Sequence, residues 1–109
     1  MALKHLLPMQ PVDIHPLEAG LADAKSIALF KSEQLEVIRL VLPAGKSLPP
    51  HRVDGEMTVQ CLEGQVDIEA DGQHTQLRAA QLLYLQGGVT HSVAASSDAS
   101  LLLTVVLRA

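Results

Sequence analysis

The sequence predicts an all-β protein with an antiparallel barrel or sandwich, preceded by an irregular arm. Short apolar runs follow one another from Ser26 onward, and turn pairs such as Asp71-Gly72 separate them, as is typical of such folds. Apolar and polar residues alternate in the central runs, which favours strands over helices. The 109 residues suffice for one modest core and are few for two domains. We therefore expect an arm at residues 1–24 and one barrel domain at residues 25–109.

The arm contains four residues that break regular structure, namely Pro8, Pro11, Pro16 and Gly20. A proline has no backbone N–H to donate and fixes its own φ, so a long helix or strand cannot run through this segment. We expect the arm to lie over the main body, with at most one turn of helix at residues 17–24.

After the arm, each strand is predicted from a run that turn residues bound. Val66, Ile68 and Ala70 alternate with polar residues, so this strand has one buried and one solvated face. The segment from Pro43 to Gly55 is expected to be a loop. The predicted strands are residues 26–31, 34–42, 56–63, 65–70, 73–77, 81–85, 91–95 and 100–107.

The last predicted strand, SLLLTVVL at 100–107, is apolar on both faces. One face belongs to the core, and the other needs a cover of its own. Two covers are open at this point: the N-terminal arm or a second subunit. We expect a homodimer that covers this strand or pairs edge strands.

Composition restricts the partners and the compartment. The formal net charge is -4 and no stretch concentrates Lys or Arg, so we expect no nucleic-acid partner. The apolar runs are too short for a signal peptide or a membrane span, so we expect no membrane partner. Cys61 is the only cysteine, which excludes an internal disulfide and fits a reducing, cytoplasmic location.

Two stretches resemble the motifs of the cupin superfamily. Gly45, five residues, His51 and then Glu63-Gly64 resemble the first motif, which is Gly, five residues, His-x-His, three or four residues, Glu, six residues, Gly. AQLLYLQGGVTHSVAA at 80–95 resembles the second motif, which is Gly, five residues, Pro-x-Gly, two residues, His, three residues, Asn. The resemblance covers residues 34–107. It implies a small jelly-roll barrel, or double-stranded β-helix, of the small single-domain cupins, which are often dimers.

The same comparison of motifs implies a degenerate metal site. His51 and His91 occupy two of the four ligand positions of the family. Val53 stands where the second histidine is expected, and Met57 stands where the glutamate is expected. Two imidazoles alone hold a first-row ion weakly, so a metal site requires a third donor.

Three residues are candidates for that third donor. If Met57 faces the interior, alternation places Cys61 on the same face and Glu56 on the other. Met57 or Cys61 beside two histidines suits copper. A one-residue bulge near Gly55 would instead turn Glu56 inward and suit a divalent ion such as iron, manganese or zinc.

These observations lead to two alternative functions. In the first, the barrel binds a small molecule, for example a small carboxylate, and His51 and His91 present polar tips to it, with or without a weak metal ion. The resemblance implies the alternative, a metal-dependent enzyme of the dioxygenase or isomerase type that uses an ion on His51, His91 and a third donor. Whether the chain is an enzyme stays open. The predicted pocket residues are Val53, Met57, Val59, Cys61, Tyr84 and Gln86.

Overall fold

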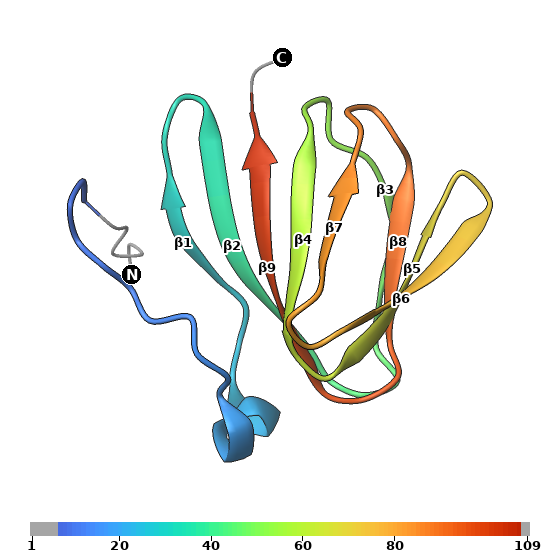
Figure 1. Ribbon diagram of the computed structural model, residues 1–109, viewed down its shortest axis with the longest axis horizontal. Helices are drawn as coiled ribbons and strands as arrows, with labels where there is room; N and C mark the ends of the chain where they lie inside the picture. The colour runs from blue at the N-terminus through green and yellow to red at the C-terminus, as the bar shows by residue number, and fades with distance from the viewer. Residues whose placement is uncertain (1–6, 108–109) are drawn as a thin grey trace.

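Two antiparallel sheets face each other in the computed structural model, which describes residues 7–107 (Figure 1). One sheet has five strands in the order β1-β2-β9-β4-β7, and the other has four in the order β3-β8-β5-β6. A short 3-10 helix, η1, precedes the first strand. The elements are η1 Glu18–Asp23, β1 Ile27–Lys31, β2 Leu35–Leu42, β3 Ser47–His51, β4 Met57–Glu63, β5 Gln65–Ala70, β6 Gln73–Arg78, β7 Leu82–Leu85, β8 His91–Ala95 and β9 Ala99–Val106.

The prediction of an all-β jelly roll is confirmed, and all eight predicted strands are present with bounds within one residue. The prediction of a loop from Pro43 to Gly55 is wrong for β3. Pro49 and Pro50 concealed this strand, because proline cannot donate to a strand ladder. They are tolerated because β3 is an edge strand and its pairing with β8 is irregular at this point.

The core lies between the two sheets and follows the alternation of the strands. On β4, Met57, Val59 and Cys61 are at most 4% exposed, whereas Thr58 and Gln60 are only half-buried on the other face. On β5, Val66 and Ile68 meet them from the opposite sheet. Other members of the core are Leu42, Leu77, Leu85, Val93, Ala95, Ala99, Leu101 and Val105.

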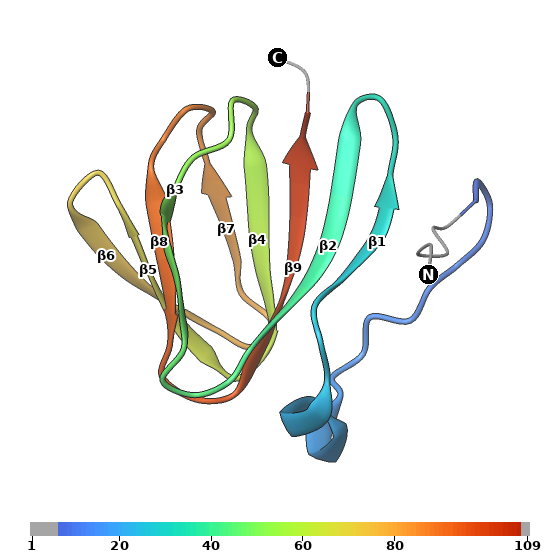
Figure 2. The same ribbon diagram turned by 180° about the vertical axis from the view of Figure 1, so that it is seen from behind.

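The arm is hydrogen-bonded to the barrel at its base, residues 15–18, and runs along the edge of the sheet before that point. The Glu63 carboxylate accepts hydrogen bonds from the backbone N–H groups of Leu17 and Glu18, each at 2.9 Å. The carbonyl of His15 accepts one from Arg39 Nη2 at 2.7 Å. From there toward residue 7 the chain runs beside the edge of β1 and not across the sheet (Figure 2).

The arm therefore covers β9 only in part. Ser100, beside its base, is fully buried, whereas the outward side chains of Leu102 and Val106 stay half-exposed. No helix within residues 7–107 is long and apolar enough to cross a membrane.

Candidate functional site

Two histidines meet at one end of the barrel. His51 ends β3, His91 begins β8, and the two residues are cross-strand partners. Their ring centroids lie 4.4 Å apart with the ring planes tilted by 57°. The structure therefore places both imidazoles within reach of one small ligand.

A bulge in β3 brings His51 to this position. Leu48 pairs with Val93, and His51 pairs with His91, so β3 has one more residue than β8 between the two pairs. Without the extra residue, strand alternation would place Pro50 opposite His91 and turn His51 outward. The bulge at the two prolines thus aims the histidine into the barrel, as bulges beside functional sites often do.

Both rings are held by the same kind of backbone contact. His51 Nδ1 lies 3.1 Å from the carbonyl oxygen of Pro49, and His91 Nδ1 lies 3.2 Å from that of Val89. A carbonyl oxygen can only accept, so Nδ1 carries the hydrogen in each contact. In the neutral ring, Nε2 then keeps a free lone pair. The site therefore offers two acceptor nitrogens to a ligand.

The two histidines differ in burial. His91 is 3% exposed, whereas His51 is exposed at the barrel mouth. Burial lowers the pKa of His91, the Val89 carbonyl opposes this, and the charge of a protonated His51 lowers the pKa further. His91 is therefore neutral at pH 7 and acts as an acceptor.

A hollow of about 330 Å³ opens at the mouth between the sheets. Of the predicted pocket residues, Val53 and Met57 line it together with His51. The rest of the apolar wall comes from Ile38, Leu103, Val105, Val106 and Leu107, and the charged residues Glu36, Arg52 and Asp54 lie around it.

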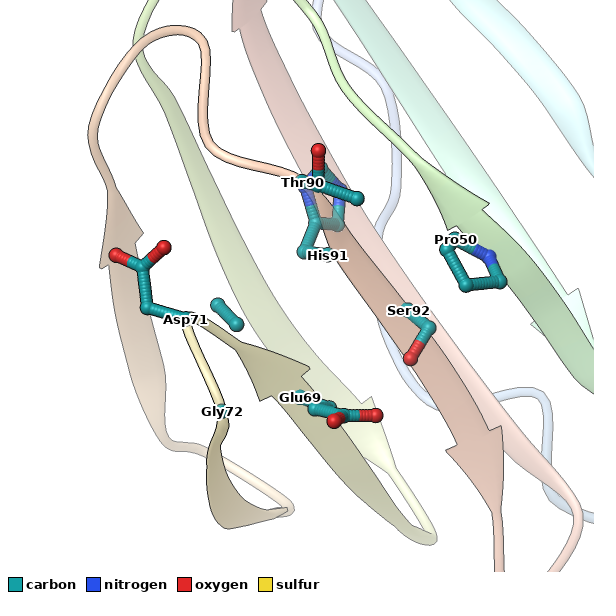
Figure 3. A pocket seen from close by; sticks show the side chains of 8 residues that line it. Pro50, Glu69, Asp71, Gly72, Thr90, His91 and Ser92 are labelled. Carbon is teal, nitrogen blue, oxygen red and sulfur yellow. The ribbon is translucent and has the colours of Figure 1, made fainter.

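His91 borders a second hollow of about 280 Å³, where the ends of β3, β5 and β8 meet (Figure 3). Its lining is more polar and includes the cross-strand partners Glu69 and Ser92, with Asp71 at the turn beyond. The histidine pair thus lies where the two hollows approach each other. The mouth hollow, with its largely apolar wall and few polar groups, has the character of a small-molecule site.

Two predicted pocket residues belong to the packed core instead. Val59 is 1% exposed and Cys61 is fully buried. The Cys61 thiol donates to the carbonyls of Glu63 at 3.4 Å and Gly64 at 3.5 Å, and burial raises its pKa. Cys61 lies four positions along the strand from Met57, a distance of about 13 Å. Cys61 therefore lies too far along the strand to be a third donor beside the histidines.

The other predicted residues lie outside the barrel. Tyr84 is 56% exposed, and its hydroxyl donates to the Glu56 carboxylate, which raises the pKa of the phenol. Gln86 is exposed and lines a separate hollow beside Tyr84. Glu56 does not turn inward as the expected bulge near Gly55 would require, because it is exposed and accepts the Tyr84 hydroxyl. The Gly55 backbone lies close against β9, since a Cβ on Gly55 would lie 1.8 Å from the carbonyl oxygen of Val106.

The positions of the predicted donor residues limit the kinds of metal site that they could form. Within residues 7–107, no three or more His, Cys, Asp or Glu side chains are placed to hold one ion. A catalytic ion ordinarily needs three protein ligands. The donor set does not fit such a site. The Met57 thioether lines the same hollow as His51.

Glu36 is a site residue that the sequence reasoning missed. It lies on β2 opposite Val105 and is half-buried at the mouth. The signal was present in LEVIRLVL, because Glu36 is in phase with Ile38, Leu40 and Leu42 and so interrupts an otherwise apolar inner face. A carboxylate in phase with core residues indicates a functional wall or an opening of the core.

Comparison with known proteins agrees with this architecture. The sequence profile of the cupin domain matches residues 38–107, more than half of the chain. The chain belongs to the cupin family. No significant match was found among curated proteins. Members of the cupin family often bind metal ions, and this chain retains only part of the corresponding ligand set.

Solved structures share the fold of this cupin over different lengths. A cupin superfamily protein from Desulfitobacterium hafniense is 20% identical with a TM-score of 0.79, covering 99% of this chain and 100% of that one. A conserved Streptococcus pyogenes protein of unknown function is 18% identical with a TM-score of 0.76, covering 100% and 99%. A glycine-to-alanine mutant of salicylate 1,2-dioxygenase from Pseudoaminobacter salicylatoxidans is 21% identical with a TM-score of 0.64, covering 66% of this cupin and 21% of the dioxygenase. At these identities the likeness concerns the fold.

Proposed function

We propose that this cupin binds a small molecule at the barrel mouth, with Nε2 of His51 and of His91 as hydrogen-bond acceptors. One observation carries the proposal: both Nδ1 atoms face backbone carbonyls, which leaves both Nε2 atoms of two adjacent rings without a protein partner. Polar atoms held in this way are preorganised for a ligand.

The ligand class follows from the charges at the mouth. His91 is neutral at pH 7, and of the three charged residues around the hollow, Glu36 and Asp54 are carboxylates and Arg52 is a cation that pairs with Asp54 at 3.9 Å. A small carboxylate, as first expected from the sequence, would meet acceptors and a negative charge. A small alcohol or amine, whose O–H or N–H can donate, suits the site better. A volume of about 330 Å³ is at the small end of ligand pockets.

A fragment titration tests this proposal. Small alcohols, amines and carboxylates of matched size are added to the protein at neutral pH, and the backbone and histidine-ring NMR signals are followed. We expect alcohols or amines to shift the signals of His51, His91 and Val53, and carboxylates to leave them unchanged. Preferential binding of carboxylates would contradict the proposed class.

Substitutions show whether the histidines carry the binding. His51→Ala and His91→Ala should each weaken binding of the best fragment by about tenfold, as expected for loss of one hydrogen bond to a buried ligand. His74→Ala is the matched control, because His74 is an exposed histidine on the other side of β5 that bonds to Asp67. Binding that survives both site substitutions would place the ligand elsewhere.

A second candidate is a weak copper(I) site on the two Nε2 atoms and the Met57 thioether. It is supported by the position of Met57 on the wall of the hollow with His51, and by the affinity of soft sulfur donors for copper(I). Titration of copper(I) against a competing chelator tests it. We expect Met57→Leu, which keeps the volume, to lower the affinity by about tenfold. Equal affinity would exclude the thioether.

The remaining alternative, a metal-dependent dioxygenase or isomerase, has less support, because a third ligand of the usual kind is missing from residues 7–107. We assign no reaction. The free, buried Cys61 supports the further proposal of a reducing, cytoplasmic location.

A further inference from the structure

A row of cross-strand partners lies on the five-stranded sheet at the end of the barrel where the two histidines meet. The strand register places its four members side by side, one each on β2, β9, β4 and β7: Glu36, Val105, Met57 and Leu85. The last three are buried and belong to the core, so the row lies on the inner face. Glu36 is half-buried and is the one charged member. The row is therefore an apolar wall with a carboxylate at one side.

The histidine pair belongs to a matching row on the other sheet. His51 on β3 pairs with His91 on β8, which pairs with Ala70 on β5. Both rows lie at the upper end of the barrel in Figure 1, where β4 and β8 begin and β3 and β9 end. The mouth hollow of about 330 Å³ touches both rows, since Glu36 and His51 line it. The carboxylate and the histidine pair are therefore on the two facing walls of one site.

Glu36 has no cationic partner within the described chain. Among residues 7–107, no Lys, Arg or His side chain forms an ion pair with it. This includes Lys31, its cross-strand neighbour on β1. Arg52 is the only Lys or Arg among these residues that lines the hollow, and it is largely exposed and lies 3.9 Å from Asp54. A half-buried carboxylate loses part of its hydration, so a charged donor in the hollow would interact favourably with Glu36.

The hollow is apolar apart from these groups at its walls. Ile38, Leu103 and Val105 line it on the side of Glu36, and Val53 lines it on the side of His51. Facing sheets pack about 10 Å apart, and side chains extend into this gap from both sides. A molecule that contacts both the carboxylate and the histidines therefore needs only a short apolar linker between two polar ends.

We propose that the ligand of the mouth site is a small amino alcohol, whose ammonium group pairs with Glu36 and whose hydroxyl donates to the histidines. This assignment rests on the proposed function, because it needs the free Nε2 atoms of His51 and His91 as acceptors. It adds Glu36 as the residue that selects a cation over a neutral alcohol. Aliphatic amines resemble the lysine side chain, with a pKa of about 10.4, and so are charged at neutral pH. A hydrogen bond between ammonium and carboxylate is roughly twice as strong as a neutral one.

Matched compounds test whether one ligand contacts both walls. Amino alcohols of increasing chain length, from ethanolamine to aminohexanol, are titrated at neutral pH. The tightest binder is then compared with the alcohol and the amine of the same chain length. We expect the amino alcohol to bind at least about tenfold more tightly than either, because it keeps both polar contacts. Equal affinity of the amino alcohol and the plain alcohol would overturn the proposal.

Substitutions assign the two ends of the ligand. Glu36→Gln keeps the shape and removes the charge, so it should weaken the amino alcohol and the amine by about tenfold and leave the alcohol unchanged. His51→Ala should weaken the amino alcohol and the alcohol and leave the amine unchanged. Glu33→Gln is the matched control, because Glu33 is exposed between β1 and β2 and the change in net charge is the same. An amino alcohol that loses no affinity in Glu36→Gln would overturn the proposal.

Failure of the Glu36 contact and failure of the histidine site give different results. If the alcohol binds through the histidines and Glu36→Gln has no effect on any compound, the histidine site stands and the role of Glu36 is overturned. Binding that survives both His51→Ala and His91→Ala, or no binding by any of the compounds, would contradict the proposed function and the amino alcohol together.

Discussion

Two polar clusters of this protein are each positioned by one extra residue in a strand, and they differ in what they leave free. The bulge in β3 turns His51 inward to meet His91, and a bulge in β4 between Cys61 and Glu63 turns Glu63 outward. There the Glu63 carboxylate meets Arg39 and Ser100 under the base of the arm. One extra residue thus positions the candidate ligand site in one place and an anchor for the arm in the other.

Both Glu63 oxygens, the Ser100 hydroxyl and Arg39 Nη2, which together form this anchor, are hydrogen-bonded within the chain. Arg39 Nη2 lies 3.4 Å from Glu63 and 3.3 Å from Ser100 Oγ, and Ser100 donates to Glu63 at 2.7 Å. Burial alone would raise the pKa of Glu63, but hydrogen bonds from Leu17, Ser100 and Glu18 and the charge of Arg39 outweigh it and lower the pKa. Within residues 7–107, Arg39 Nε is the one buried side-chain nitrogen or oxygen atom without a hydrogen-bond partner.

The histidine pair, in contrast, leaves half of its hydrogen-bonding groups without a partner in the chain. Each ring uses one nitrogen for the backbone and leaves the other without a protein partner. Polar groups that are satisfied internally stabilise a fold, and groups held in place but left free are available for binding. The comparison predicts that substitutions in the anchor affect stability, whereas substitutions in the pair affect ligand binding.

The largest expected effect is on the anchor. Glu63→Ala removes the partner of a buried guanidinium and should lower the free energy of unfolding by about 3 kcal/mol, the lower end for a broken buried pair, because Glu63 keeps 13% exposure. Urea unfolding measures this. Ser100→Ala, which loses a hydroxyl but no charge, should cost about 1 kcal/mol. A cost for Glu63→Ala no larger than that for Ser100→Ala would contradict the role of the anchor.

Met57→Glu tests the other cluster by adding a carboxylate to the mouth. We expect a stability loss of about 2 kcal/mol, because Met57 is only 4% exposed, and a gain of at least about tenfold in manganese affinity, because two imidazoles and a carboxylate suit hard divalent ions. Calorimetry measures the affinity, and Met57→Leu is the control of matched volume. Unchanged affinity would mean that the carboxylate and the histidine pair do not converge.

The smallest effect is a difference in pH dependence between the two clusters. The pKa of His91 is lowered on folding, so its contribution to stability is present above the ordinary value of 6.5 and declines as the pH falls below it. The pKa of Glu63 is also lowered, so its contribution declines only as the pH falls below 4.5.

Paired variants isolate the two contributions. The stability difference between wild type and His91→Gln should change from about pH 7 to pH 5, and that between wild type and Glu63→Gln only at lower pH. Exposed His74, whose pKa is raised mainly by its hydrogen bond to Asp67, is replaced by Gln in all chains, because its contribution changes in the opposite direction. If both stability differences changed over the same pH range, the assignment of the two pH dependences to His91 and Glu63 would be contradicted.

The sequence was sufficient for most of the fold, because the strands are amphipathic or apolar runs bounded by turns. The alternation in QVDIEA and MTVQC fixed which faces are buried, and the structure agrees. The bulges were not predictable in this way. Pro49 and Pro50 suggested a loop, and nothing local in QCLEG shows that Glu63 leaves the face of Cys61.

The candidate site was predictable only in part for the same reason. The motif spacing identified His51 and His91, but the partners of Tyr84 and Glu56 depend on contacts between β4 and β7, which are distant in the sequence. Glu36 could have been found from its phase alone. The carbonyl contacts that orient both rings depend on backbone geometry that no residue type encodes.

The tautomer of the two histidines tests the central claim most directly. Long-range ¹H–¹⁵N spectra of the rings at about pH 8, assigned with His51→Gln and His91→Gln, show which nitrogen carries the hydrogen. We predict that both rings are protonated on Nδ1, with Nε2 unprotonated and available to a ligand. Rings protonated on Nε2 would leave neither histidine with an acceptor nitrogen for a ligand and contradict the account.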